Sequence, residues 1–144
     1  MKKLFLTSVF AKTAKEFKKF YGETNGKSAA FIPTAAKADG GGTIYIKRQR
    51  RALEKLGIKA CVLDISAAGS NEISAKLQNS DIIYIGGGNT FYLLQELKQS
   101  GADMIIREQI ALGKAYIGES AGAVVAAPRI DYIEDMDNRD AAPN

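Results

Sequence analysis

Residues 116–123 read Tyr-Ile-Gly-Glu-Ser-Ala-Gly-Ala. Within this stretch, residues 118–122 have the form G-x-S-x-G, after the apolar run 115–117 and before a run of small residues that reaches Ala127. That is the strand–turn–helix setting of a nucleophile elbow, which exposes a serine at the carboxyl end of a parallel sheet. We expect Gly118 and Gly122 to let the strand and the helix approach closely, with Ser120 as a nucleophile. A glycine-rich turn with an ordinary serine is the alternative.

Working outward, short apolar runs alternate with amphipathic segments along the whole chain. This alternation predicts one α/β domain over residues 1–144, with a mainly parallel sheet covered by helices on both faces. The first strand is expected to be buried. The predicted strands are 4–9, 28–32, 59–65, 81–85 and 114–117, and the predicted helices are 11–21, 44–56, a short one from residue 70, 91–99, 102–112 and 120–127.

A second glycine-rich stretch, residues 86–90, follows the fourth predicted strand and reads Gly-Gly-Gly-Asn-Thr. Loops of this kind meet outside the carboxyl ends of neighbouring parallel strands. The backbone N–H of Gly88 or of its neighbours could therefore donate to an oxyanion. A phosphate cradle is a second interpretation, although the spacing is not G-x-G-x-x-G. A tight turn with Asn89 or Thr90 as a helix cap is the third, and it is compatible with the first.

The composition limits the chemistry. The chain has 20 basic and 16 acidic residues, one cysteine and no histidine. Mechanisms that use a histidine as base or metal ligand are therefore excluded within these residues. We expect no metal and no cofactor. Cys61, expected in the core, cannot form an internal disulfide, which favours a reducing, cytoplasmic setting. The basic run 47–51 is interpreted as a solvated helix face, so neither a nucleic acid nor a membrane is an expected partner.

Two motifs together, IYIGGGNTFYLLQEL at 83–97 and AYIGESAGAVVAAP at 115–128, resemble peptidase family S51, which contains aspartyl dipeptidase (peptidase E) and cyanophycinase. Residues 31–35 also fit that family. The resemblance implies a doubly wound sheet similar to class I glutamine amidotransferases, whose elbow usually holds cysteine. It implies Ser120 as the nucleophile, and an oxyanion hole formed by Gly87, Gly88, Asn89 and Ala121. The implied reaction is hydrolysis of the peptide bond after an N-terminal aspartate in short peptides.

The chain departs from the family pattern at its end. In the family, the triad histidine follows the elbow helix and an acidic stretch, whereas residues 129–144 form an acidic, loop-like tail in which this sequence stops. We therefore expect a C-terminally incomplete domain that is nearly inactive alone, because a serine without a base is a poor nucleophile. Glu119 and Asp135 are the acid/base candidates within the chain, with Glu134 also nearby. An exposed sheet edge would favour a homo-oligomer.

Two other functions stay open at this point. The first is a non-catalytic relative whose elbow binds a small anionic ligand, which the lack of histidine favours. The second is a nucleotide-binding module that uses the triglycine loop of residues 86–88.

Overall fold

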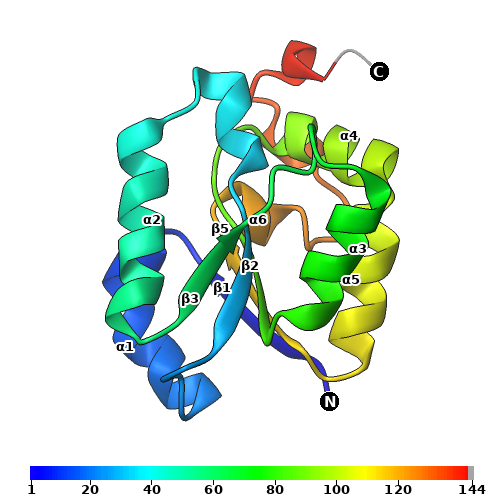
Figure 1. Ribbon diagram of the computed structural model, residues 1–144. Helices are drawn as coiled ribbons and strands as arrows, with labels where there is room; N and C mark the ends of the chain where they lie inside the picture. Colours follow the sequence, from blue (N-terminus) through cyan, green and yellow to red (C-terminus); the bar gives the residue numbers. More distant parts are fainter. Residues whose placement is uncertain (143–144) are drawn as a thin grey trace.

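The computed structural model describes residues 1–142, in which five parallel strands form one sheet with helices on both faces (Figure 1). Every strand pairs in parallel with its neighbours. The expected doubly wound, parallel α/β fold is confirmed. In spatial order the strands are β1 (Lys3–Thr7), β5 (Ala115–Glu119), β4 (Ile82–Ile85), β2 (Ser28–Ile32) and β3 (Lys59–Val62).

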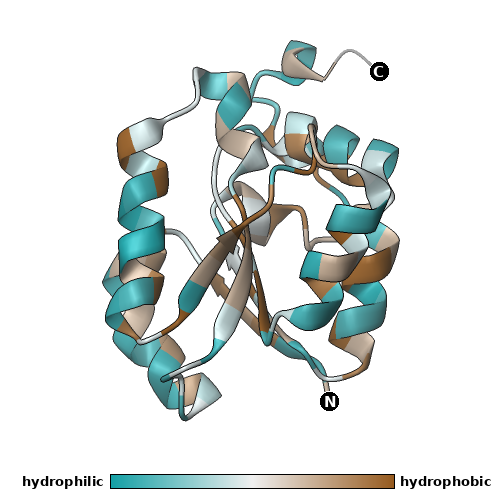
Figure 2. Cartoon of the chain, viewed as in Figure 1, coloured by the Kyte–Doolittle hydropathy of each residue, from teal (hydrophilic) through white to brown (hydrophobic). Residues whose placement is uncertain are grey.

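The helices divide between the two faces of the sheet. One face carries α1 (Phe10–Tyr21) and α2 (Thr43–Lys55), and the other carries α3 (Ser70–Asn79), α4 (Thr90–Ser100) and α5 (Ala102–Ala111) (Figure 1). Apolar residues gather along the strands and on the inward sides of the helices, while the outward sides are polar (Figure 2). This distribution follows the amphipathic spacing of the helices, which buries one stripe of each against the sheet.

The core consists of two apolar layers separated by the sheet. Because successive strand residues point to opposite faces, each central strand contributes to both layers. The layer between the sheet and the helices α1 and α2 contains Phe10, Phe17, Phe31, Leu53, Tyr84 and Ile117. The layer between the sheet and the helices α3, α4 and α5 contains Ile32, Leu63, Ile73, Leu77, Ile83, Leu93 and Ile106. The near-continuous apolar character of β2, β4 and β5 reflects burial on both faces.

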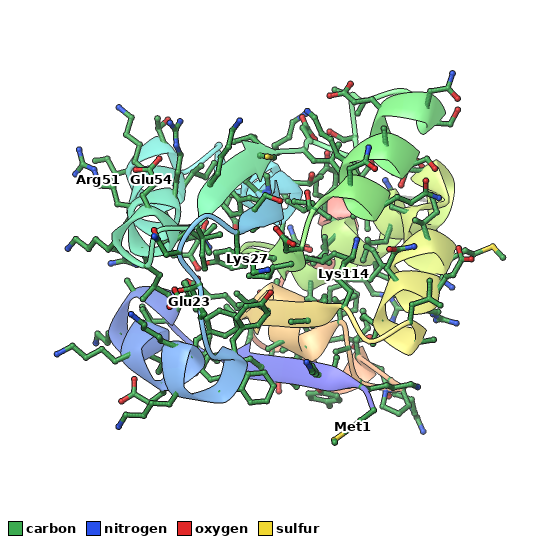
Figure 3. The ribbon with its side chains drawn as sticks, turned by 60° about the horizontal axis from the view of Figure 1, so that its bottom comes forward. Met1, Glu23, Lys27, Arg51, Glu54 and Lys114 are labelled. Carbon is green, nitrogen blue, oxygen red and sulfur yellow. The ribbon has the colours of Figure 1, made fainter. Side chains whose placement is uncertain are left out.

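The expectation that the first strand is buried is wrong. β1 is an outer strand of the sheet, as Figure 3 shows from below, where Met1 marks its start. Leu4 and Leu6 are 42% and 51% exposed. Their side chains lie on the part of the sheet that no helix of residues 1–142 covers fully, so an apolar sequence run does not by itself secure burial at an edge.

Several element ends also differ from the sequence prediction. A 3₁₀ helix, η1 (Thr34–Asp39), follows β2, and the elbow helix α6 (Ala121–Val124) is one turn long. Isolated turns continue to Ala127, whose N–H donates to Val124. Strand β3 stops at Val62 because Asp64 begins a turn, in which its side chain accepts the N–H of Ser66.

The acidic tail is more ordered than a solvated loop. It forms two short 3₁₀ turns, η2 (Asp131–Ile133) and η3 (Arg139–Ala141). The Thr90 N–H donates to Asp137 Oδ2 at 2.7 Å and the Asn89 side chain donates to the Asn138 carbonyl at 2.8 Å, which fixes the tail against the start of α4. Residues 143 and 144 of the predicted tail lie outside the described residues. No helix within 1–142 has the length and apolar character needed to traverse a bilayer.

Candidate active site

Ser120 stands in a strained turn between β5 and α6. It is the one non-glycine residue among those described with a positive φ, 51°. Its N–H donates to the Thr7 carbonyl at 2.9 Å, which extends the β1–β5 pairing by one residue, and its own carbonyl accepts the N–H groups of Ala123 and Val124. The chain therefore reverses within a single residue, and the Ser120 side chain is left exposed. A non-glycine residue held in this region costs about 1–3 kcal/mol, a strain that clusters at functional sites.

Two glycines allow this turn to pack closely. A Cβ on Gly122 would lie 2.2 Å from the Ile85 carbonyl oxygen, and one on Gly118 would lie 2.5 Å from the Gly122 carbonyl oxygen. The predicted close approach of strand and helix is thus confirmed. Tyr116 completes the packing, since its hydroxyl donates to the Gly122 carbonyl at 2.5 Å. Burial raises the pKa of Tyr116 above its ordinary value, so this hydroxyl keeps its proton.

The triglycine loop is held by η1 and by α4. Gly88 has φ 142°, and a Cβ there would lie 2.2 Å from the Ala35 carbonyl oxygen. The next N–H, of Asn89, donates to that same carbonyl at 3.1 Å. The Asn89 side chain accepts the Tyr92 N–H at 3.0 Å, which makes Asn89 the predicted cap of α4. The loop is therefore both a tight turn and a helix start.

The loop and the elbow meet at the carboxyl end of the sheet. A Cβ on Gly87 would lie 3.1 Å from Ser120 Cβ. Within residues 1–142, no hydrogen bond occupies the N–H groups of Gly88 and Ala121. The structure thus brings together Ser120, Ala121 and residues 87–89, as the sequence predicts. Their function as an oxyanion hole stays a prediction.

Glu119 lies directly behind this turn and is only 1% exposed. Tyr45 in the first turn of α2 donates to Glu119 Oε1 at 2.6 Å, and Tyr84 in β4 donates to Oε2. Burial and the neighbouring Glu119 raise the pKa of both tyrosines well above the ordinary value, so both keep their donor protons. Within the described chain, Glu119 makes no hydrogen bond to Ser120.

The second acid/base candidate, Asp135, is exposed, and no hydrogen bond or ion pair within residues 1–142 fixes it. Its neighbour Glu134 pairs with Arg139 instead. The acidic side chain of the tail that reaches the glycine loop is Asp137, through the Thr90 N–H. Sequence reasoning missed Asp137, because its position depends on how the tail folds back.

Tyr45, Tyr84 and Gln49 were also missed. Gln49 is 2% exposed, near the Tyr84 hydroxyl, and neither of its amide atoms forms a hydrogen bond of normal geometry. Two signals pointed to this cluster. Tyr84 lies two residues before the glycine loop, on a strand face shared with Ile82, and Glu119 is a charged residue at the end of an apolar strand.

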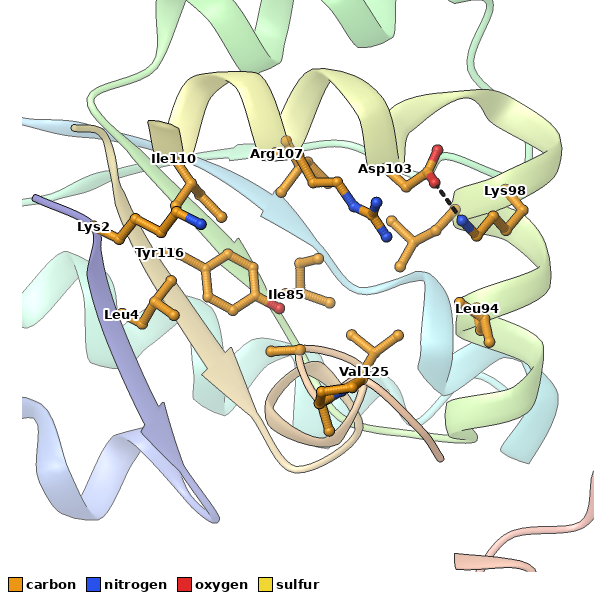
Figure 4. Close-up of a pocket in the computed structure, with 15 residues that line it drawn as sticks. Lys2, Leu4, Ile85, Leu94, Lys98, Asp103, Arg107, Ile110, Tyr116 and Val125 are labelled. Atoms are coloured by element: carbon orange, nitrogen blue, oxygen red, sulfur yellow. Dashed lines mark ion pairs between the residues drawn. The ribbon is translucent and has the colours of Figure 1, made fainter. Parts of the chain in front are cut away.

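A separate groove of about 440 Å³ lies on the face of the sheet that carries α4 and α5. Leu4, Ile85, Tyr116 and Val125 line it, and Lys98 pairs with Asp103 at one end (Figure 4). Neither Ser120 nor the triglycine loop borders it. Within the described part of the chain, no group of three or more histidine, cysteine, aspartate or glutamate side chains is arranged to hold a metal ion.

The chain is similar to known peptidases over its whole length. The model of peptidase family S51 matches residues 4–144. An uncharacterized peptidase of Listeria monocytogenes, Lmo0363, is 49% identical over 144 residues, which cover 100% of this chain and 70% of that protein. Peptidase E of Haemophilus influenzae is 36% identical over 117 residues, 81% of this chain and 51% of that protein.

Solved structures agree with these sequence matches. The crystal structure of a peptidase E candidate from Listeria monocytogenes superposes with a TM-score of 0.96 at 49% identity, and the match covers 100% of this chain and 71% of that one. A peptidase from an acI-B1 actinobacterium gives a TM-score of 0.67 at 25% identity over 87% of this chain and 57% of that one. The chain spans 70% of the Lmo0363 protein and about half of the length of Haemophilus peptidase E.

Proposed function

The chain belongs to peptidase family S51, and we propose that it forms the nucleophile-bearing part of a serine peptidase that cleaves short peptides after an N-terminal aspartate. The observation that carries this proposal is the exposed Ser120, held at φ 51° against Gly87. A reactive serine needs such an exposed turn, which separates its hydroxyl from the side chains around it. Relatives named peptidase E support a peptidase activity, and the preference for an N-terminal aspartate is part of the proposal.

In the proposed reaction, Ser120 Oγ attacks the carbonyl carbon of the scissile peptide bond. The C–N bond then breaks, the leaving amine takes up a proton, and water hydrolyses the resulting ester to release aspartate and restore the Ser120 hydroxyl. The negative charge that develops on the carbonyl oxygen is stabilised by the N–H groups of Gly88 and Ala121. The attacking hydroxyl must lose its proton to a base, and residues 1–144 contain no histidine. Without a triad base, catalysis is limited to about 10³-fold over water. We propose that the protein expressed from its full native reading frame supplies the base, and that the 144-residue chain is nearly inactive.

The test combines intact mass with hydrolysis of the dipeptide Asp-Leu. Protein from the native reading frame is compared with the 144-residue chain, and each is paired with its Ser120→Ala variant. We expect turnover by a longer native protein, loss of that turnover in Ser120→Ala, and no turnover by the 144-residue chain. Hydrolysis that survives Ser120→Ala would refute the nucleophile. Clear turnover by the 144-residue chain would refute the requirement for an external base.

The lack of histidine also favours a second function, in which the elbow binds a small anionic ligand without chemistry. The unoccupied N–H groups of Gly88 and Ala121 suit an anion as well as an oxyanion. Calorimetric titration with aspartate separates the two functions. Saturable binding that Ser120→Ala leaves intact, by a native product of 144 residues that does not hydrolyse Asp-Leu, would favour the binding protein.

We also propose a location in the cytoplasm and self-association of the chain. The single cysteine, Cys61, supports a cytoplasmic location, which fractionation of cells that express the native protein would test. The exposed Leu4 and Leu6 on the outer strand β1 support self-association through that edge. Size-exclusion chromatography that gives a monomer at every concentration would contradict it.

A further inference from the structure

Glu119 is unusual among the acidic residues because it is buried without a cation. It is 1% exposed, and no ion pair within residues 1–142 involves it. Taking a carboxylate out of water is costly unless hydrogen bonds replace the lost hydration. Two tyrosine hydroxyls supply those bonds here. A cost of this kind next to a nucleophile invites a functional explanation.

The two tyrosines differ in what else they touch. The Tyr84 ring lies 5.1 Å from the Phe10 ring and 5.0 Å from the Phe31 ring, measured between centroids, so Tyr84 is part of the apolar layer. Tyr45 is only partly buried and is the third residue of α2, which begins directly after the glycines at 40–42. The guanidinium of Arg48 lies 5.3 Å above its ring, which restrains the ring from the solvent side.

Tyr45 connects the buried carboxylate to the triglycine loop. A Cβ on Gly87 would lie 2.5 Å from Tyr45 Oη and 3.1 Å from Ser120 Cβ. The Gly87 backbone amide lies near the Tyr45 oxygen and opposes the rise of the Tyr45 pKa, although the two form no hydrogen bond of normal geometry. The same hydroxyl donates its proton to Glu119. The order of contacts is therefore Glu119, Tyr45, Gly87, and then the space beside Ser120. Tyr84 reaches the same carboxylate, but the atoms nearest to a Cβ on Gly87 belong to Tyr45 and Ser120.

We propose that Glu119 and Tyr45 are positioning residues that fix the triglycine loop beside Ser120. In this assignment, the Tyr45 oxygen packed against Gly87 keeps the Gly87 N–H away from the substrate side and orients the following peptide unit. Gly88 and Ala121 are then the oxyanion donors, and Gly87 is not. Fixed donors cost no reorganisation when charge develops on the substrate, which is the basis of their effect on rate. This assignment rests on the proposed serine peptidase function.

The experiment compares two substitutions that each remove one hydroxyl from Glu119. Tyr45→Phe also removes the oxygen that packs against Gly87, whereas Tyr84→Phe leaves that oxygen in place. Glu119→Gln keeps an acceptor oxygen without the charge, and Tyr21→Phe, far from the site in α1, is the inert control. Each variant is made in protein from the native reading frame, and its thermal unfolding is recorded first, so that only folded variants are compared.

The first readout is amide hydrogen exchange of residues 86–89, which does not depend on hydrolysis. We expect Tyr45→Phe to speed this exchange at least about tenfold, Glu119→Gln to speed it less, and Tyr84→Phe and Tyr21→Phe to leave it within about twofold. Unchanged exchange in Tyr45→Phe would overturn the proposal whatever the activity. Equal acceleration in Tyr45→Phe and Tyr84→Phe would also overturn it, because general loosening around Glu119 would then explain the result.

The second readout is the hydrolysis of Asp-Leu. A loop that is slightly misplaced should lower kcat about 10²-fold in Tyr45→Phe while KM changes less than about threefold, because the lost contact acts mainly in the transition state. Faster loop exchange with unchanged kcat would refute the role in catalysis. Faster loop exchange in a native protein that does not hydrolyse Asp-Leu would refute the proposed peptidase function and leave the positioning contacts standing.

Discussion

Two carboxylates stand where strands end on the same edge of the sheet, Glu119 at the end of β5 and Asp64 just after β3. Glu119 is 1% exposed and receives two tyrosine hydroxyls. The Asp64 side chain is 32% exposed and receives Lys37 Nζ at 2.8 Å, with Thr34 and Ser66 as further donors. The first carboxylate is neutralised by no cation, and the second has a lysine in direct contact.

Glu119 is a buried carboxylate without a cation, whereas Asp64 belongs to an ordinary surface ion pair. Burial raises the pKa of Tyr84, because ionising it beside Glu119 would place two negative charges together in the interior. Burial alone would raise the pKa of Asp64, but the hydrogen bonds from Lys37 and Ser66 outweigh that effect and lower it. The two clusters should therefore lose their contributions to stability at opposite ends of the pH scale.

The largest expected effect is that of Glu119→Ala on stability. It leaves the fully buried Tyr84 hydroxyl without its acceptor and opens a void between β5 and α2. We expect the free energy of unfolding to fall by about 3 kcal/mol. Urea unfolding of the 144-residue chain, followed by circular dichroism, measures it. The matched control is Asp64→Ala, for which a loss below about 1 kcal/mol is expected. Equal losses in the two variants would abolish the distinction between the clusters.

The second prediction concerns Tyr84→Phe at alkaline pH. The folded chain holds the Tyr84 proton above pH 10, whereas the unfolded chain releases it near that value. The stabilising contribution is thus complete below about pH 10 and is lost as the pH rises, at about 1.4 kcal/mol per pH unit for one group. Tyr84→Phe should reduce the alkaline slope of the unfolding free energy by that amount. It should also cost about 2 kcal/mol at neutral pH, since Glu119 loses a donor.

Tyr116→Phe serves as the comparison for that slope. Its hydroxyl is buried on the other face of the sheet with a raised pKa, but it donates to a neutral carbonyl. Tyr116→Phe should lower the alkaline slope similarly, with a smaller loss of about 1 kcal/mol at neutral pH. An unchanged slope in Tyr84→Phe would mean that Tyr84 ionises normally, which would contradict a buried charge beside it.

The third prediction concerns the stability of Gln49 variants, which tests whether Gln49 belongs to the Glu119 cluster. Its amide is buried without a hydrogen bond, and a Cβ on Gly86 would lie 2.8 Å from its nitrogen. Burying an unpaired amide is unfavourable, so Gln49→Leu should raise the unfolding free energy by about 1 kcal/mol. Gln49→Glu, which places a second carboxylate near Glu119, should instead destabilise the chain. A loss of stability in Gln49→Leu would show that the amide is satisfied and is part of the cluster.

The sequence predicts much of this edge of the molecule. The parallel sheet, the helices on both faces and the turns at residues 86–90 and 118–122 follow from apolar periodicity and from glycines, which are local signals. The sequence also places Ser120, Ala121 and residues 87–89 together, because parallel strands end on one edge. Their meeting within a few ångströms is therefore a consequence of topology.

The partners of Glu119 could not be predicted in the same way. Tyr45 is 74 positions before Glu119 in the chain, and its contact depends on where the first turn of α2 lies relative to the end of β5. No periodic pattern in the sequence encodes that placement. The exposure of β1 was missed for a similar reason, since an apolar run carries no information on whether its strand is central or at an edge. Long-range side-chain contacts and strand order are what the structure adds.

The smallest expected effect belongs to the surface cluster. Lys37→Met removes the cation beside Asp64 and keeps most of the apolar stem. Because both side chains are about a third or more exposed, we expect a loss of no more than about 1 kcal/mol at pH 7. The pKa of Asp64 is lowered in the folded chain, so its contribution is present above the unfolded pKa near 4 and is lost as the pH falls through the folded value. The difference between Lys37→Met and the unsubstituted chain should therefore shrink below pH 4, in unfolding measured across that range. If the difference instead persisted unchanged at low pH, the lysine would act through packing, and Asp64 would not be the charged counterpart that the comparison with Glu119 requires.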